Sequence, residues 1–370
     1  MIVADFIERF EAYCPPSLAE EGDPIGLQIG DRNAVVKKIL VTLDVRPQVV
    51  AEAIAAGVDL IFAKHPLIFR PAKTITTDNP QTKMYLDLIQ HQIAVYVAHT
   101  NLDIVPNGLN DWFCEALEIQ ETDYLTPTHT KKFYKLQTFV PASHTTILRD
   151  ALANVGAGVL GAYQGCAFTS AGTGYFTPNV EAKPFSGTKN QPSAVPEEKL
   201  EVSFPEELLA MVVETVWQHH PYEEPVLDIF LDEGKRENYG LGRVGNLATP
   251  IPLADFIQRV KKTFAVPTVK VIANDPQQMV QRIAICGGSG EKFYPDAIRQ
   301  HADVYITGDV YYHTAHDMEA LGLTVIDPGH YIESFCKEKL VRLFNSWQLE
   351  KEEDLTIVAS KVNTNPFSFQ

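Results

Sequence analysis

Cysteine is scarce in this sequence, and no two cysteines form a recognisable pair. The five cysteines (Cys14, Cys114, Cys166, Cys286 and Cys336) are scattered over 370 residues, and none belongs to a C-x-x-C motif. An odd and dispersed set excludes a disulfide framework and a zinc site built from thiolates. The pattern is typical of a protein in a reducing compartment, so we expect a cytoplasmic location.

Long apolar runs and an excess of basic residues are also missing. No run reaches the roughly 18 to 20 apolar residues of a membrane span, so we expect no membrane association. The 31 Lys and Arg are outnumbered by 47 Asp and Glu, which gives a formal net charge of −16. Such a surface repels phosphate backbones, so nucleic acid is not expected as the main partner. The first ten residues contain Asp5 and Glu8, which excludes a secretory signal there and predicts an amphipathic helix with Phe6 and Phe10 on one face.

The first third of the sequence alternates strand and helix patterns. Short apolar runs predict buried strands, and apolar residues at helical spacing predict the helices between them. The expected elements are strands at 36–43, 59–64 and 93–98 and helices at 47–56, 81–91 and 107–117. This alternation favours a parallel sheet covered by helices, in which sites form at the carboxyl ends of the strands.

The last third repeats the alternation. It predicts strands at 282–286, 303–307, 323–326 and 355–359 and helices at 292–301, 311–321 and 331–346. Residues 39–65 align without gaps with residues 283–309 and are identical at four positions, including Ile39 with Ile283 and Asp59 with Asp303. Four identities alone could arise by chance, but the matched strand–helix–strand spacing favours a duplicated α/β unit.

The middle third has a different pattern. It predicts a strand at 132–140, a helix at 144–154, two strands within 157–176, a helix at 205–219 and a strand at 226–231. This β-α-β-β-α-β order is the ferredoxin-like pattern. The stretch 177–198 is rich in Pro, Ser and Asn and is predicted to be a mobile loop.

These patterns together predict the fold class and the domain organisation. We expect a duplicated α/β core with mixed or parallel sheets, interrupted by a ferredoxin-like α+β domain. The predicted boundaries are 1–127 for the first half of the core, 128–242 for the inserted domain and 243–370 for the second half.

Histidines and carboxylates follow three of the predicted core strands. His65 ends the strand at 59–64, His99 and Asp103 follow the strand at 93–98, and His330 and Glu333 follow the strand at 323–326. Because parallel strands end at one edge of a sheet, we expect these side chains to converge. Imidazoles and carboxylates without thiolates suit zinc, manganese or iron, and two carboxylates among several histidines could bridge a metal pair.

The same residues also have interpretations in which they are purely structural. Each of these elements on its own is more typical of a structural turn, and the metal-site prediction depends on all three occurring in one core. His99 could orient Asp103 instead of binding a metal ion itself.

Two further segments could line a substrate pocket. Gly288 and Ser289 lie in a glycine-rich turn between a strand and a helix, whose amides could hold an anion, although a simple tight turn is the alternative. Tyr312 and His313 begin the helix at 311–321 and could contact a base or ring, or else pack at an interface. Residues 219–225 (HHPYEEP) close a helix of the middle third, where a separate metal or ligand site is the less favoured interpretation.

Several of these segments, taken in order, are similar to those of a known protein family. The sequence resembles the family of GTP cyclohydrolase 1 type 2 homologues, the Nif-three-like proteins, from end to end. HHPYEEP is similar to the mark of members that carry an inserted PII-like, ferredoxin-fold domain. The matching segments are EGDPIGLQIGD (21–31), KHPLIF (64–69), VAHTNLD (97–103), YITGDVYYHTAHD (305–317), DPGHYIE (327–333) and SKVNTNPF (360–367).

The resemblance implies a homohexameric ring lined by dinuclear metal centres. It implies that the metal ligands are His65, Asp103, His330 and Glu333, with His99 beside them. One position departs from the family pattern, because Lys64 stands where the family usually has a first histidine. An ammonium is not a ligand unless deprotonated, and its charge opposes a nearby cation, so one of the two metal positions is weakened, empty or filled differently.

Two functions compete, and the sequence leaves open whether the chain is an enzyme. The first is a metal-dependent hydrolase of a nucleotide or phosphoester, with one or two divalent ions per chain, zinc before iron or manganese. The alternative is a non-catalytic, metal-binding hexameric sensor or scaffold that binds a small molecule through the inserted domain. A role in metal storage or insertion has no sequence feature of its own.

Overall fold

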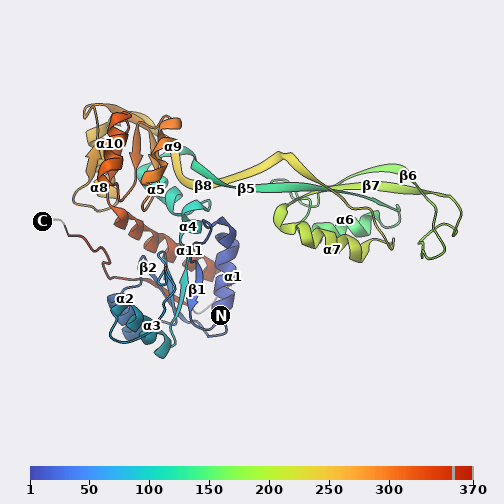
Figure 1. Cartoon of the computed structure of the whole chain (residues 1–370), viewed down its shortest axis with the longest axis horizontal. Helices are drawn as coiled ribbons and strands as arrows, with labels where there is room; N and C mark the ends of the chain where they lie inside the picture. Colours follow the sequence, from blue (N-terminus) through green and yellow to red (C-terminus); the bar gives the residue numbers. More distant parts are fainter. Residues whose placement is uncertain (352–354, 369–370) are drawn as a thin grey trace. The chain divides into compact units, whose positions relative to one another are not determined.

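The computed structural model describes residues 1–351 and 355–368. The chain divides into two units, one made of Met1–His129 with Tyr239–Gln370 and the other of Thr130–Asn238. We call them the core unit and the inserted unit; Figure 1 gives their elements. The sequence-based domain boundaries, at residues 128 and 242, lie within a few residues of these divisions.

The first sheet of the core unit has five strands in the order β1-β4-β3-β2-β13. Its strands are β1 (Gly26–Ile29), β2 (Lys38–Thr42), β3 (Leu60–Ala63), β4 (Ala94–Val97) and β13 (Thr356–Ala359). Strands β13, β2, β3 and β4 are parallel, and β1 pairs antiparallel with β4. The sheet is therefore mixed, and its last strand comes from the far end of the chain.

Alternating side chains of this sheet fill two separate cores. Phe62 and Tyr96 pack on one face with Phe6 and Phe10, so the predicted amphipathic N-terminal helix is confirmed. Side chains at the intervening positions point to the opposite face and pack against two other helices. The helices around this sheet are α1 (Val3–Tyr13), α2 (Pro47–Ala56), α3 (Pro80–Gln90), α4 (Thr100–Ile104), α5 (Leu109–Leu117) and α11 (Cys336–Lys351), with 3-10 helices η1 (Pro16–Leu18) and η4 (His330–Phe335).

The second sheet of the core unit continues from β8 in the order β8-β10-β11-β12-β9. Strands β10, β11 and β12 are parallel, with antiparallel β8 and β9 on either side. Ile283 pairs with Val304 as Ile39 pairs with Leu60, so both strand–helix–strand units have the same offset. The elements are β8 (Asp228–Pro252), α8 (Leu253–Thr263), β9 (Lys270–Ile272), β10 (Met279–Ile285), η3 (Glu291–Phe293), α9 (Tyr294–Arg299), β11 (Val304–Ile306), α10 (Tyr312–Ala320) and β12 (Thr324–Asp327).

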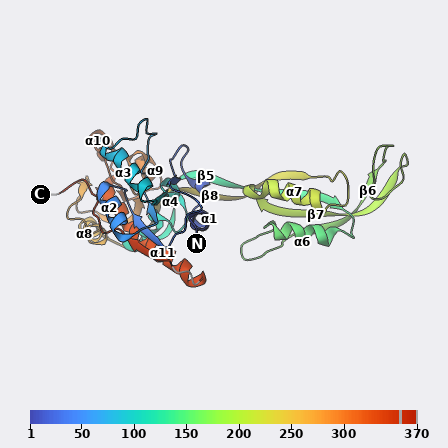
Figure 2. The same ribbon diagram turned by 90° about the horizontal axis from the view of Figure 1, so that it is seen from below.

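The inserted unit contains the predicted β-α-β-β-α-β order. Two helices, α6 and α7, pack on one face of the antiparallel strands through Leu148, Leu152, Val212 and Val216. Both helices can be followed in Figure 2, which shows the ribbon from below. The elements are β5 (Gln120–Val140), α6 (Thr145–Asn154), β6 (Phe168–Phe176), β7 (Ser193–Pro205), η2 (Glu206–Leu208) and α7 (Leu209–His219), followed by the start of β8.

Some local predictions were wrong. Of the two strands expected within 157–176, only β6 forms, because residues 157–167 are occupied by glycine turns with positive φ at Gly158, Gly161 and Gly165. The end of the stretch predicted as a loop, 193–198, belongs to β7. The helix expected at 107–117 begins at Leu109, after the short α4.

No helix among the described residues is long and apolar enough to cross a membrane. The five cysteines are free thiols, as the scattered pattern predicted.

Candidate metal site

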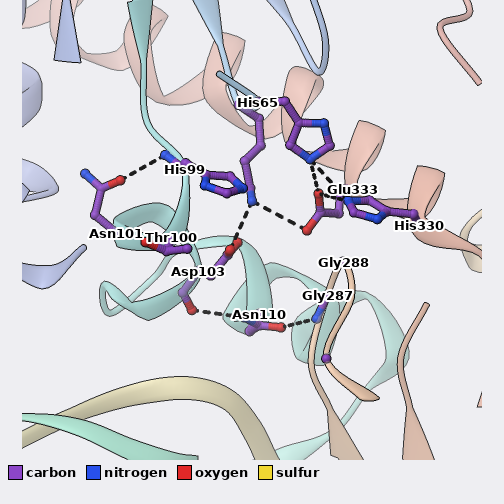
Figure 3. A network of polar contacts seen from close by, with 12 residues as sticks. His65, His99, Thr100, Asn101, Asp103, Asn110, Gly287, Gly288, His330 and Glu333 are labelled. Atoms are coloured by element: carbon purple, nitrogen blue, oxygen red, sulfur yellow. Dashed lines mark hydrogen bonds and ion pairs between the residues drawn. The ribbon is translucent and has the colours of Figure 1, made fainter. Parts of the chain in front are cut away.

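Two histidines and a carboxylate meet at the carboxyl ends of strands from both core sheets. His65 follows β3 in the first sheet, and His330 and Glu333 lie on η4 directly after β12 in the second. Figure 3 shows both imidazoles turned toward the Glu333 carboxylate. The convergence follows from parallel strands, which bring the loops at their carboxyl ends together.

One oxygen of Glu333 is shared by the two imidazoles. Its Oε2 lies 2.7 Å from His65 Nε2 and 3.3 Å from His330 Nε2, and the two Nε2 atoms are 3.3 Å apart. The three donor atoms all lie within 4.8 Å of one another. Two imidazole nitrogens and a carboxylate oxygen are a ligand set for a divalent ion of the zinc, iron or manganese type.

Each histidine is held from behind by an aspartate. His65 Nδ1 lies 2.8 Å from Asp44 Oδ1, and His330 Nδ1 lies 2.6 Å from Asp309 Oδ2. A carboxylate at Nδ1 keeps the proton there and leaves Nε2 as the metal-binding nitrogen. Although burial lowers the pKa of His330, Glu333 and Asp309 raise it to about 9. The donor set therefore fits a divalent ion, which would replace the protons on the two Nε2 atoms.

Lys64 lies between the two buried carboxylates of the site. Its ammonium is 3.0 Å from Asp103 Oδ2 and 3.5 Å from Glu333 Oε1, and the side chain is 1% exposed. Burial alone would lower the pKa of Lys64, but the charges of Asp103 and Glu333 raise it, so the lysine stays protonated. Burial would raise the pKa of Glu333, yet Lys64 and the two histidines hold it well below its usual range. A fixed positive charge therefore lies where the resemblance implies part of a second metal position.

Asp103 contacts Lys64 through one oxygen only. Its other oxygen, Oδ1, is buried and has no hydrogen-bond partner among the described residues. Burial raises the pKa of Asp103, although Lys64 opposes this. A buried carboxylate oxygen without a partner is rare and indicates that a water molecule or another group completes the site.

His99 lies beside the site and is paired with a residue that the sequence analysis missed. Its Nδ1 is 2.7 Å from Asp23 Oδ1, and its ring centroid is 5.8 Å from that of His65. Asp23 also accepts hydrogen bonds from the backbone and hydroxyl of Thr100. His99 is therefore oriented by Asp23, and Asp103 is held by Lys64 instead of by His99.

The glycine-rich turn packs directly against the site. Gly288 has φ +63°, and a Cβ there would lie 2.8 Å from Glu333 Oε1. The Gly287 amide donates to Asn110, and the Gly290 amide donates to Thr307. The amides on either side of Gly288 and Ser289 are thus bonded within the protein, and Ser289 is exposed.

The other predicted positions lie outside the cluster. Tyr312 is 69% exposed, and its ring contacts within the described chain are with His313 and His316 of the same helix. In the HHPYEEP segment, His220 donates from Nε2 to the Phe139 carbonyl and accepts at Nδ1 from the Tyr222 amide. His220 is therefore bound to the backbone, as the structural interpretation expects.

The supporting aspartates were also missed from the sequence. Asp44 lies just after β2 and Asp309 just after β11, so the rule that located His65 and His330 also covers them. Asp23 could not be found this way because it precedes β1.

The whole chain is similar to known proteins. It is 45% identical over 363 residues to the GTP cyclohydrolase 1 type 2 homolog of Bacillus subtilis, covering 98% of this chain and 97% of that protein. It is 43% identical over 366 residues to the protein of that name from Listeria innocua, covering 99% and 98%.

Solved structures are also similar to this chain over its whole length. The crystal structure of a Bacillus cereus protein related to NIF3 has a TM-score of 0.90 at 39% identity, covering 100% of this chain and 99% of that one. A Staphylococcus aureus protein of known structure has a TM-score of 0.84 at 31% identity, with the same coverage. The pattern of the Duf34/NIF3 (NGG1p interacting factor 3) family matches residues 1–366. With its fold and full-length relatives in agreement, the chain belongs to the Duf34/NIF3 family.

Proposed function

We propose that this protein is a metal-dependent hydrolase of a nucleotide or another phosphoester that holds one divalent ion per chain. The observation that carries the proposal is the meeting of His65 Nε2, His330 Nε2 and Glu333 Oε2 within 4.8 Å. Asp44 and Asp309 fix both imidazoles in the orientation that a metal ion requires. The name shared by the relatives, GTP cyclohydrolase 1 type 2 homolog, supports a nucleotide as the substrate class.

Lys64 favours one metal ion per chain over the pair of ions that the family resemblance implies. Glu333 turns Oε2 toward the imidazoles and Oε1 toward the ammonium, so its two oxygens serve two different cations. The lysine already pairs with both Asp103 and Glu333, and a second metal ion between them would meet a like charge. Zinc is the ion we propose first, with iron and manganese as alternatives that suit the same ligands.

The residues around the ligands have separate roles in the proposed reaction. When bound, the ion supplies a Lewis acid that lowers the pKa of water and offsets developing negative charge. His99 carries its Nδ1 proton toward Asp23, which leaves Nε2 to accept a proton from an attacking water. Asp103 Oδ1 is available to accept a hydrogen bond that orients that water, while Lys64 helps to keep Glu333 charged.

Several finer features accompany the proposal. The strand order β6-β7-β5-β8 with two helices on one face supports assigning the inserted unit to the PII-like, ferredoxin-fold subgroup. We further propose a homohexameric ring, on the basis of the family resemblance, and a cytoplasmic location, on the basis of the scattered free cysteines.

Metal content and activity test this function together. Untagged protein purified without added metal is analysed for metal per chain and for hydrolysis of nucleotides, beside His330→Ala and the control His91→Ala. His91 is exposed at the end of α3, so its loss should leave both measurements unchanged. We expect about one zinc, iron or manganese ion in the wild type and in His91→Ala, and loss of metal and turnover in His330→Ala. Equal metal and turnover in all three proteins would reject the proposed site.

A cavity in the inserted unit favours the second candidate, a small-molecule sensor. The cavity has a volume of about 1090 Å³ and is of the size that accommodates small ligands. Its lining includes Phe139, Tyr175, Phe185, Glu197 and Tyr222. A sensor would show thermal stabilisation by mononucleotides that persists in His330→Ala and disappears in Phe185→Ala, whereas a hydrolase would show the opposite dependence.

A further inference from the structure

The segment after the last strand ends beside the metal site. Strand β13 is parallel to β2, with Thr356 opposite Lys38 and Ala359 opposite Val41. Parallel neighbours end at the same edge of a sheet, so the residues after Ala359 emerge beside those after Thr42. Asp44, which holds His65, is one of those residues.

Hydrogen bonds and apolar packing hold this terminal segment, which begins at Ser360, against the core unit. The Ser360 amide donates to the Val41 carbonyl over 2.8 Å, and the Lys361 amide donates to Glu52 over 2.9 Å. Lys337 donates from Nζ to the Ser360 carbonyl over 3.0 Å. Val362 then packs against the buried cluster that contains Leu40 of β2 and Ile61 of β3. The backbone is therefore held in place up to the residues that approach the site.

Thr364 contacts Asp44, the residue that holds His65, and also η4, which supplies His330 and Glu333. Its hydroxyl donates to Asp44 Oδ2 over 2.5 Å, and Asp44 Oδ1 accepts from His65 Nδ1 over 2.8 Å. Its amide donates to the Tyr331 hydroxyl over 3.3 Å. Tyr331 stands between His330 and Glu333 on η4.

We propose that Thr364 is a positioning residue for the metal site, acting through Asp44 on His65. The proposal rests on the metal site proposed above. With Thr364 on one oxygen and His65 on the other, Asp44 cannot turn without breaking one of the two hydrogen bonds. The imidazole is thereby kept with Nε2 toward Glu333 and His330. Partners of this kind behind a metal-binding histidine change metal affinity by about 10- to 100-fold.

The test is a Co²⁺ titration of the full-length, metal-free protein, followed by the visible absorption of the bound ion. Thr364→Val keeps the shape of the side chain and removes the hydroxyl, whereas Thr364→Ser keeps the hydroxyl. Thr356→Val is the matched control, because Thr356 is exposed at the start of β13 in the same part of the chain. We expect Thr364→Val to bind Co²⁺ about 10-fold more weakly and with an altered spectrum, and Thr364→Ser and Thr356→Val to match the wild type.

The possible results separate this proposal from the metal site itself. Equal affinity and an identical spectrum in Thr364→Val would overturn the role of Thr364 and leave the metal site intact. Equal losses in Thr364→Val and Thr364→Ser would also overturn it, because the hydroxyl would then not be responsible. A wild type that binds no Co²⁺ would overturn both the site and the role of Thr364.

Discussion

The ammonium of Lys64 lies 3.0 Å from the carboxylate of Asp103 in the interior of the core unit. Neither group can be removed without leaving the other buried and charged. The pair is therefore a structural requirement of the core unit and, under the proposed function, the reason for a single metal ion.

Replacing Lys64 by Met should destabilise the metal-free protein. Asp103 and Glu333 would remain buried close together without their counter-charge, which costs about 3–5 kcal/mol. The measurement is the free energy of unfolding in urea in the presence of a chelator. Lys73→Met, at an exposed position after β3, is the control and should change stability by less than about 0.5 kcal/mol. Similar stabilities for the two variants would mean that the Lys64 charge does not hold the carboxylates.

Replacing Lys64 by His should raise the metal content from one ion per chain to two. The imidazole would supply a ligand beside Asp103 and Glu333 Oε1 and would remove the opposing positive charge. The measurement is the number of metal ions per chain after purification without added metal. Two ions already present in the wild type would contradict the proposed role of Lys64.

Replacing Gly288 by Ala should disturb the metal site beyond its effect on the backbone. Both Gly288 (φ +63°) and Gly57 (φ +62°) are left-handed, but a Cβ at Gly57 meets nothing within 4 Å, whereas one at Gly288 lies 2.8 Å from Glu333 Oε1. Each Ala variant should lose about 1 kcal/mol of stability from backbone strain. Only Gly288→Ala should also weaken Co²⁺ binding, because Glu333 must move. Unchanged Co²⁺ binding in Gly288→Ala would show that the turn does not constrain Glu333.

Stability should fall in acid partly through His220 in the inserted unit. Burial lowers the pKa of His220, and Nδ1 accepts a hydrogen bond from Tyr222, so the folded protein keeps the ring neutral. Below pH about 6.5 the unfolded chain takes up a proton that the folded chain resists, so this contribution is present at neutral pH and lost as the pH falls.

The free energy of unfolding at pH 7.5 and pH 5.5 checks this expectation. The wild type should lose more stability across this interval than His220→Gln, which has no titrating ring. His219→Gln is the control, since His219 belongs to the same helix end and bonds to the Thr215 carbonyl. Equal pH dependence in wild type and His220→Gln would refute the role of His220.

The fold was predictable where sequence periodicity determines structure. Short apolar runs located β2, β3, β4, β10, β11 and β12 to within a few residues, because buried parallel strands are apolar on both faces. The edge strands β1 and β9 were missed. They are short and only partly buried, so their pattern does not stand out from a loop.

The site was predictable only in part, for a related reason. The position of a strand end can be read from the sequence, and it brought His65, His330 and Glu333 together. The partners of a polar side chain cannot be read in this way. Nothing local indicates that Asp23 holds His99 across the fold or that Lys64 lies between Asp103 and Glu333.

The pairing of β13 with β2 has a consequence for the order in which the protein is completed during synthesis. Until residue 359 has left the ribosome, β2 is an open edge of the first sheet. Asp44 and His65 are made early, whereas His330, Glu333 and Thr364 are made last. The proposed metal site therefore forms only after residue 333 has been made, and a product truncated before residue 330 would lack two of the ligands and the strand that covers this edge.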